Sequence, residues 1–223
     1  MRQIVDGVFE LRVGFVNVHL VVVDDGVVLI DTGLPGRRAA PRIQSALYGV
    51  RRAVGDVTVI LLTHKHPDHT GGVAELRRRS GARVVAHEAD APVITGAAAP
   101  VLKPVQRIGA IFMPMPQPSP VDDLLAGDST VPVPGFRAVH TPGHTPGGVC
   151  FYAKDLATVF TGDTLLHGGP SATGRSFSDG GVLLMSITDR LLSLPRQTIV
   201  KAGHGDDTTI ADERSGVLTA LDK

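Results

Sequence analysis

Cysteine, tryptophan and net charge are the scarce features of this chain of 223 residues. Cys150 is the only cysteine, so no disulfide can form within the chain, and we expect a reducing compartment, the cytoplasm by default. Basic and acidic side chains balance at 22 each, without the surplus of Lys and Arg that binding to nucleic acid requires. No segment reaches the roughly 18 consecutive apolar residues of a membrane-spanning helix. These absences predict a cytoplasmic protein whose partners include neither nucleic acid nor a membrane.

Apolar residues make up 43% of the chain and fall into short β-branched runs and longer helical stripes. The expected strands cover residues 8–13, 18–23, 27–30, 57–63, 83–86, 130–133, 136–140, 148–153, 157–161 and 198–201. The expected helices cover residues 37–54, 68–79, 182–194 and a last stretch from Ile210. Residues 20–33 and 150–164 resemble each other as hairpins, which is compatible with two β-rich halves packed face to face. The class predicted is α/β (α+β), with helices covering sheets.

Proline interrupts this pattern between residues 89 and 120. Four prolines alternate with other residues at 114–120, which excludes a helix or an internal strand there. We interpret residues 1–223 as a single domain with an insertion at about 89–120, which contains a helix near residues 101–112. Three roles for the insertion stay open: a roof over the active site, a contact in a homodimer, or packing on its own domain.

Four side chains of metal-ligand type lie within six residues, in the segment Thr-His-Lys-His-Pro-Asp-His. His64 and His66 are two residues apart at the end of an expected strand, so both imidazoles should project from the same face. Asp68 and His69 follow at the start of a helix, where the chain has turned and can direct two more ligands to the same point. Zn²⁺ accepts imidazole nitrogen and carboxylate oxygen, and Fe²⁺ and Mn²⁺ also suit such a set. A polar turn that is merely rich in histidine is the alternative, but chance assembly of this pattern is rare.

Three later residues each add one ligand at the end of an expected strand: His144, Asp163 and His204. Alone, a histidine or aspartate beside glycine is more often a turn residue. Together with the first cluster they make seven ligands, enough for two divalent metal ions with three protein ligands each and one bridge. Hydrolytic metal sites leave such positions open for water and substrate.

These motifs resemble those of the metallo-β-lactamase superfamily. The resemblance implies that the first metal is held by His64, His66 and His144, the second by Asp68, His69 and His204, and that Asp163 bridges them. Asp31 matches the aspartate of the family's early Asp-Thr-Gly, which usually has a structural role. The implied fold is a four-layered αββα sandwich with the site at the sheet edges between its two halves.

Within that superfamily the chain is most similar to short hydroxyacylglutathione hydrolase (glyoxalase II)-like enzymes, which share Gly174-Arg175, Ser186-Ile187 and Gly203-His204-Gly205. The resemblance implies two metal ions, most simply Zn²⁺, and a bridging hydroxide that attacks a thioester or another acyl ester. Asp68 would be the catalytic residue, orienting the hydroxide and passing a proton to the leaving group. The two metals with their ligands leave a locally cationic pocket, so we expect a small, anionic acyl substrate.

Three other functions stay open at this point. A persulfide dioxygenase would use one iron on two histidines and one aspartate, and a lactonase would open a cyclic ester. A metal-binding module without catalysis is disfavoured, because degenerate family members usually lose ligands whereas all seven are present here. His167, on the loop after Asp163, and Arg175 are the candidate substrate contacts; Arg175 suits a carboxylate or phosphate.

Overall fold

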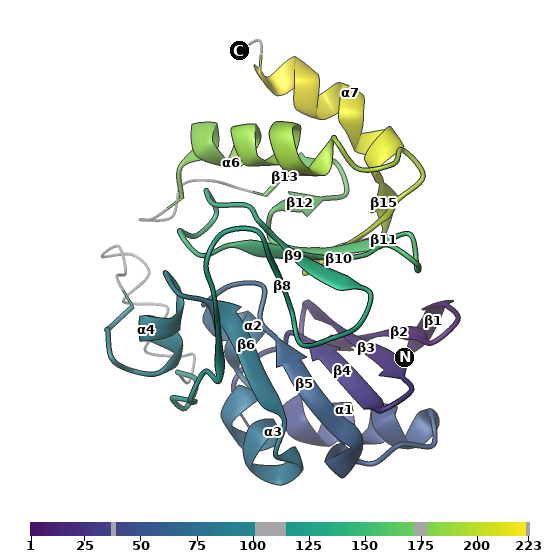
Figure 1. Ribbon diagram of the computed structural model, residues 1–223, viewed down its shortest axis with the longest axis vertical. Coiled ribbons are helices and arrows are strands. Elements are labelled where there is room, and N and C mark those ends of the chain that lie inside the picture. The colour runs from purple at the N-terminus through teal and green to yellow at the C-terminus, as the bar shows by residue number, and fades with distance from the viewer. Residues whose placement is uncertain (37–38, 101–114, 172–177, 222–223) are drawn as a thin grey trace.

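The computed structural model describes residues 1–36, 39–100, 115–171 and 178–221. Two large sheets lie against each other, and helices cover the outer face of each (Figure 1). Buried side chains form three clusters that match this layering: one between the first sheet and its helices, one between the sheets, and one between the second sheet and its helices. The chain therefore has the four-layered αββα sandwich that the sequence predicts.

The first sheet is built from the N-terminal half of the chain. Its strands run in sequence order: β1 (Arg2–Val5), β2 (Val8–Val13), β3 (Val16–Val23), β4 (Gly26–Ile30), β5 (Val57–Leu61), β6 (Arg83–His87) and β7 (Asp123–Leu125). The strands from β1 to β4 pair antiparallel, and those from β4 to β7 pair parallel. Helices α1 (Ala39–Gly49) and α3 (Val73–Ser80) cover its outer face, where Ile43, Leu47 and Leu76 are fully buried.

The second sheet is built from the C-terminal half. Its strands run in the order β15 (Thr208–Thr209), β14 (Ile199–Ala202), β11 (Thr158–Gly162), β10 (Val149–Ala153), β9 (Phe136–His140) and β8 (Ser129–Thr130). Among the strand pairs described for this sheet, β11 with β14 is parallel and the others are antiparallel. Helix α6 (Gly180–Ser186), a π-helical turn (Ile187–Leu191) and helix α7 (Ile210–Leu221) cover this sheet, and β12 (Leu165–Leu166) pairs with β13 (Gly169–Pro170) beside it.

Two expected helices are shorter than predicted. The helix expected at 68–79 is split into α2 (Pro67–Thr70) and α3, because the amide of Gly71 bonds to the carbonyl of Gly33. A Cβ on Gly71 would lie 2.0 Å from the backbone nitrogen of Pro35, so the two segments meet too closely for any side chain. The helix expected at 37–54 ends at Gly49, and a separate 3₁₀ turn, η1 (Val54–Asp56), leads into β5.

One expected strand is shortened by a proline, which has no amide hydrogen to donate to a neighbouring strand. The strand expected at 130–133 is only the short β8, because Pro132 has no amide hydrogen for a ladder and the chain turns at Val133. Sequence patterning also missed β1, which lies at the edge of the first sheet. The helix expected at 101–112 lies outside the described residues, while helix α4 (Ala91–Ile94) lies near the start of the proposed insertion. No described helix is long and apolar enough to cross a membrane.

Candidate metal centre

The carboxyl ends of four strands bring the candidate ligands to one edge of the sandwich. Strands β4 and β5 run parallel in the first sheet, and β11 and β14 run parallel in the second, so each pair ends at a common edge. Residues 64–69 follow β5, Asp163 directly follows β11, and His204 follows β14. His144 lies in the loop between β9 and β10. The structure thus brings all seven predicted residues together in two groups, each with its ligand atoms within 4.8 Å of one another.

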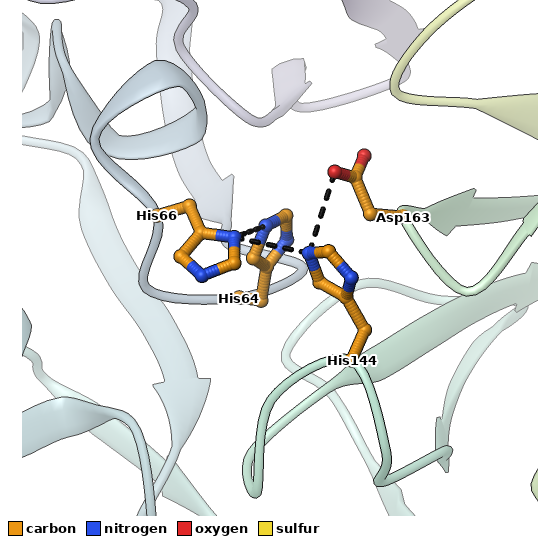
Figure 2. Close-up of side chains that lie close together, drawn as sticks. All are labelled: His64, His66, His144 and Asp163. Atoms are coloured by element: carbon orange, nitrogen blue, oxygen red, sulfur yellow. Dashed lines mark hydrogen bonds and ion pairs between the residues drawn. The ribbon is translucent and has the colours of Figure 1, made fainter. Parts of the chain in front are cut away.

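The first group consists of three imidazoles and one carboxylate. Nδ1 of His66 lies 2.9 Å from Nε2 of His64 and 3.0 Å from Nε2 of His144, and the three rings point toward one another (Figure 2). Oδ2 of Asp163 lies 3.4 Å from the same nitrogen of His144. The predicted origin of this convergence was wrong: β5 ends at Leu61, so a loop rather than the pleat of a strand directs His64 and His66.

The second group lies beside the first and consists of Asp68, His69 and His204. Nε2 of His204 lies 3.4 Å from Nε2 of His69 and 3.5 Å from Oδ2 of Asp68. Both Asp68 and His69 belong to α2, as the sequence predicts, and His204 comes from the opposite half of the sandwich. The second group therefore exists only when the two halves pack together.

Asp163 stands between the two groups. While its Oδ2 faces His144, its Oδ1 lies 3.3 Å from Nε2 of His69 and 3.4 Å from Nε2 of His204. This Oδ1 atom is buried and has no hydrogen-bond partner among the described residues. A buried carboxylate oxygen without a partner is costly, and a cation beside it removes that cost. The geometry is therefore that of a carboxylate able to bridge two cations.

Hydrogen bonds set which ring nitrogen faces the centre. Nδ1 of His69 lies 2.7 Å from Oδ2 of Asp31, so this nitrogen carries a proton and Nε2 is the nitrogen that faces the centre. Nδ1 of His204 donates in the same way to the carbonyl of Phe15 at 3.1 Å. Nδ1 of His64 and of His144 lie 3.0 Å from the hydroxyls of Thr63 and Ser171 respectively. The structural role expected for Asp31 is thus to orient a ligand.

Charge in the centre keeps the carboxylates ionised. Burial alone would raise the pKa of Asp68, but His204 and His69 outweigh it and lower the pKa to about 2. The pKa of Asp163 is likewise held well below its usual range, by His69 and His204 against the effect of burial. Burial and the neighbouring imidazoles lower the pKa of His64 well below its usual value. At neutral pH the centre therefore offers two carboxylates and at least one neutral imidazole, the forms that bind metal.

The donor set fits divalent metal ions. Three imidazoles and a carboxylate oxygen surround one point, and two imidazoles with two carboxylate oxygens surround the next. Nitrogen and oxygen donors in this mixture suit Zn²⁺, Fe²⁺ and Mn²⁺. Oδ1 of Asp163 makes no hydrogen bond among the described residues, and it faces the two imidazole nitrogens of the second group, which is the position of a shared metal ligand.

The two candidate substrate residues have different outcomes. The imidazole of His167 is 64% exposed, and its Nδ1 lies 3.9 Å from Oε1 of Glu213 on α7. Arg175 lies outside the described residues. Contact of either residue with a substrate stays a prediction.

Two polar residues that contact the ligand loops belong to no recognisable sequence motif. Asp90 follows β6 and is completely buried, and Asn17 lies on β3 and is 2% exposed. Their contacts span the two halves of the sandwich, so no local motif reveals them. The only available signal is compositional, since Asn17 is the single asparagine of the chain.

The sequence of this chain is similar to those of known proteins. A model of the metallo-beta-lactamase superfamily matches residues 11–204. The probable metallo-hydrolase YqgX of Bacillus subtilis is 30% identical over 200 residues, which are 89% of each chain. The hydroxyacylglutathione hydrolase GloC of Haemophilus influenzae is 31% identical over 191 residues, which are 83% of each chain. The chain belongs to the metallo-beta-lactamase superfamily.

A solved structure that contains two iron ions has the same fold as this chain. The crystal structure of TTHA1623 in a di-iron-bound form has a TM-score of 0.76 and 35% identity, and the match covers 92% of this chain and 96% of that one. With the relatives named above, this likeness identifies the chain as a metallo-hydrolase of the superfamily, with histidine and aspartate groups that could hold metal ions.

Proposed function

We propose that this protein is a dinuclear metal-dependent hydrolase of a thioester or another acyl ester, of the hydroxyacylglutathione hydrolase type. The observation that carries the proposal is the position of Asp163, whose two oxygens face two different groups of imidazole ligands. The likeness to GloC supports the thioester class, and the di-iron form of TTHA1623 supports a pair of metals.

In this proposal each metal has its own protein ligands. His64, His66 and His144 would hold the first ion, Asp68, His69 and His204 would hold the second, and Asp163 would be shared by both. Zn²⁺ is the proposed occupant, with Fe²⁺ and Mn²⁺ compatible with the same donors. Such ions supply a hydroxide at neutral pH by lowering the pKa of bound water, and they polarise carbonyl oxygens.

The chain's own residues would orient the attacking water and accept a hydrogen bond from it. Asp68 is the proposed catalytic carboxylate: with its pKa lowered to about 2, it is ionised and can accept a hydrogen bond from the attacking water. Its Oδ2 is within 3.5 Å of His204, so it stays oriented toward the centre. The exposed ring of Phe15 stacks on His204 with ring centroids 5.6 Å apart, which shields one side of that ligand from water.

The proposed substrate is a small anionic acyl compound. The net charge of the whole chain is zero, so attraction for an anion would come from the metal centre itself. His167, and Arg175 beyond the described part of the chain, are the proposed contacts for the substrate's acidic group. No nucleic acid, membrane or protein partner is part of the proposal.

Elemental analysis combined with a hydrolysis panel tests this proposal. The protein is purified without added metal, its metal content is measured, and it is assayed on a 2-hydroxyacyl thioester of glutathione, a lactone, a phosphodiester and a β-lactam. We expect two metal ions per chain and turnover of the thioester above the other classes. Asp68→Asn should lose at least 100-fold in kcat while its circular dichroism spectrum is unchanged.

Two results would overturn the proposal. One iron per chain with oxygen consumption on a persulfide would instead indicate a dioxygenase. Two bound metals without hydrolysis of any member of the panel would indicate another substrate class.

A further inference from the structure

Asp90 contacts both loops that carry the first group of ligands. Its Oδ2 accepts hydrogen bonds from the amide of Lys65 at 3.1 Å and from the hydroxyl of Thr145 at 2.7 Å. Its Oδ1 accepts from the amide of Gly147 at 3.2 Å and pairs with the ammonium of Lys65 at 2.9 Å. Lys65 stands between His64 and His66 in the sequence, and Thr145 follows His144.

The environment of Asp90 allows little adjustment. The residue is completely buried, and a carboxylate offers about four acceptor positions, all of which are used here. A Cβ on Gly147 would lie 2.7 Å from Cγ of Asp90, so the loop of the second half rests directly on this side chain. Asp90 itself belongs to the first half of the sandwich, after β6. One side chain therefore sets the spacing between the two loops.

Asn17 makes a corresponding set of contacts with the loop of His204. Its side-chain amide donates to the carbonyls of Ala202 at 3.1 Å and Gly205 at 3.0 Å, and its backbone amide donates to Gly203 at 2.8 Å. These three carbonyls flank His204 on both sides. Asn17 also belongs to the first half, whereas the loop belongs to the second.

We propose that Asp90 is the positioning residue for the first metal's three histidines, and that Asn17 has the same role for His204 of the second metal. Each residue acts through hydrogen bonds to ligand-bearing loops and touches no ligand atom itself. This inference rests on the metal occupancy of the proposed function, but not on its substrate. It predicts that the two metal subsites can be weakened separately.

Isosteric substitutions separate the two roles. In Asp90→Asn an amide NH₂ replaces one acceptor oxygen and faces donors, and the ion pair between Asp90 and Lys65 is lost. In Asn17→Asp a carboxylate faces the two carbonyl oxygens and cannot donate to them. Asp122→Asn is the matched control, because Asp122 also accepts a backbone amide and pairs with an arginine, Arg77, without contacting a ligand loop.

Metal occupancy at each subsite is the measurement. Crystals of the full chain and each variant are equilibrated in Zn²⁺ buffers, and anomalous scattering at the zinc edge gives the occupancy of each position. Spectra of the Co²⁺-loaded proteins in solution report the ligand geometry. We expect Asp90→Asn to weaken zinc at the first subsite 10- to 100-fold and leave the second within about threefold. Asn17→Asp should do the reverse, and Asp122→Asn should change neither.

Equal weakening of both subsites in each variant, or unchanged zinc binding in Asp90→Asn, would overturn the proposal. If Asp90→Asn does not fold, Thr145→Val removes only one hydrogen-bond donor and should still weaken the first subsite selectively. The readout also separates this inference from the proposed function. Selective loss of zinc in a protein that hydrolyses no thioester would support the positioning roles and refute the proposed substrate.

Discussion

At the scale of single residues, Asp31 shows how the chain prepares a ligand before any metal binds. Its φ angle of 59° lies in the left-handed region, which aspartate tolerates better than most residues. In this conformation Oδ1 accepts the amide of Thr63, while Oδ2 accepts the hydroxyl of Thr63 and the Nδ1 proton of His69. One buried carboxylate therefore fixes the strand end and the tautomer of a candidate ligand.

Asp31→Asn should weaken the second metal subsite. The amide nitrogen of the new side chain would face donors, so His69 would lose the partner that keeps Nε2 directed at the centre. We expect metal binding there to weaken 10- to 100-fold, measured by competition with a chelating dye. Asp123→Asn, which removes only the surface pair with Arg83, should bind metal like the parent protein. Equal affinities for both variants would contradict the role assigned to Asp31.

The convergence of the seven candidate ligands could be predicted because the spacing from His64 to His69 is chemically specific and because the later motifs at His144, Asp163 and His204 resemble those of the family. Asp90 and Asn17 could not, because an aspartate after a strand or an asparagine within one has many ordinary uses. What distinguishes them is contact with loops of the other half, which the sequence does not display. The same limit applies to Ser171, whose hydroxyl reaches His144 from the segment after β13.

At the scale of elements, the strands were easier to predict than the breaks between helices. Continuous valine and isoleucine runs identify β3, β4 and β5, because few other structures bury such runs. The gap between α2 and α3 depends instead on the segment near Pro35, which contacts Gly71 only in the folded chain. The ends of helices and strands therefore depend on tertiary contacts. The same holds for the end of β5 at Leu61, which places His64 and His66 in a loop.

Gly203→Ala should reduce the metal content while the fold persists. The added methyl group would lie 2.5 Å from Cε1 of His69 and 2.8 Å from Oδ1 of Asp163, so both ligands would have to move. We expect elemental analysis to show fewer than two metals per chain, with far-ultraviolet circular dichroism unchanged. Gly216→Ala is the control: no atom lies within 4 Å, and alanine in the α7 helix should add about 0.5 to 1 kcal/mol of stability. Normal metal content in Gly203→Ala would contradict this packing argument.

At the scale of the whole molecule, a buried ionic network joins the two sheets. Lys201 on β14 is fully buried, and its ammonium lies 2.5 Å from Oε2 of Glu10 on β2 and also contacts Asp207. Arg2 and His19 contact the same carboxylate, at 3.0 Å and 3.4 Å. The resemblance between residues 20–33 and 150–164 suggested two β-rich halves. Ion pairs as well as the apolar cluster between the sheets hold these halves together.

Glu10→Gln should destabilise the protein by about 3 kcal/mol, since it leaves the buried ammonium of Lys201 with one fewer counter-charge. Burial alone would raise the pKa of Glu10, but His19 and Lys201 lower it below its ordinary 4.5. A lowered folded-state pKa stabilises the protein above the unfolded value, and this stabilisation is lost as the pH falls below it. Urea unfolding of chelator-treated protein should therefore show a difference between parent and variant that shrinks from about pH 5 downward.

Glu88→Gln, at an exposed position, is the control and should change stability by less than about 0.5 kcal/mol. A Glu10→Gln variant as stable as the parent at neutral pH would show that this network does not hold the sheets together. So would a stability difference that grows on acidification.

Titration of the metal-free protein with zinc tests most directly the proposal that two metal ions act together in one hydrolytic centre. Thioester hydrolysis is followed as zinc is added in known equivalents to protein stripped by a chelator. We expect full activity to require two equivalents of zinc per chain, and further zinc to cause no further increase in activity. Full activity at one equivalent, or no hydrolysis after two have bound, would contradict it.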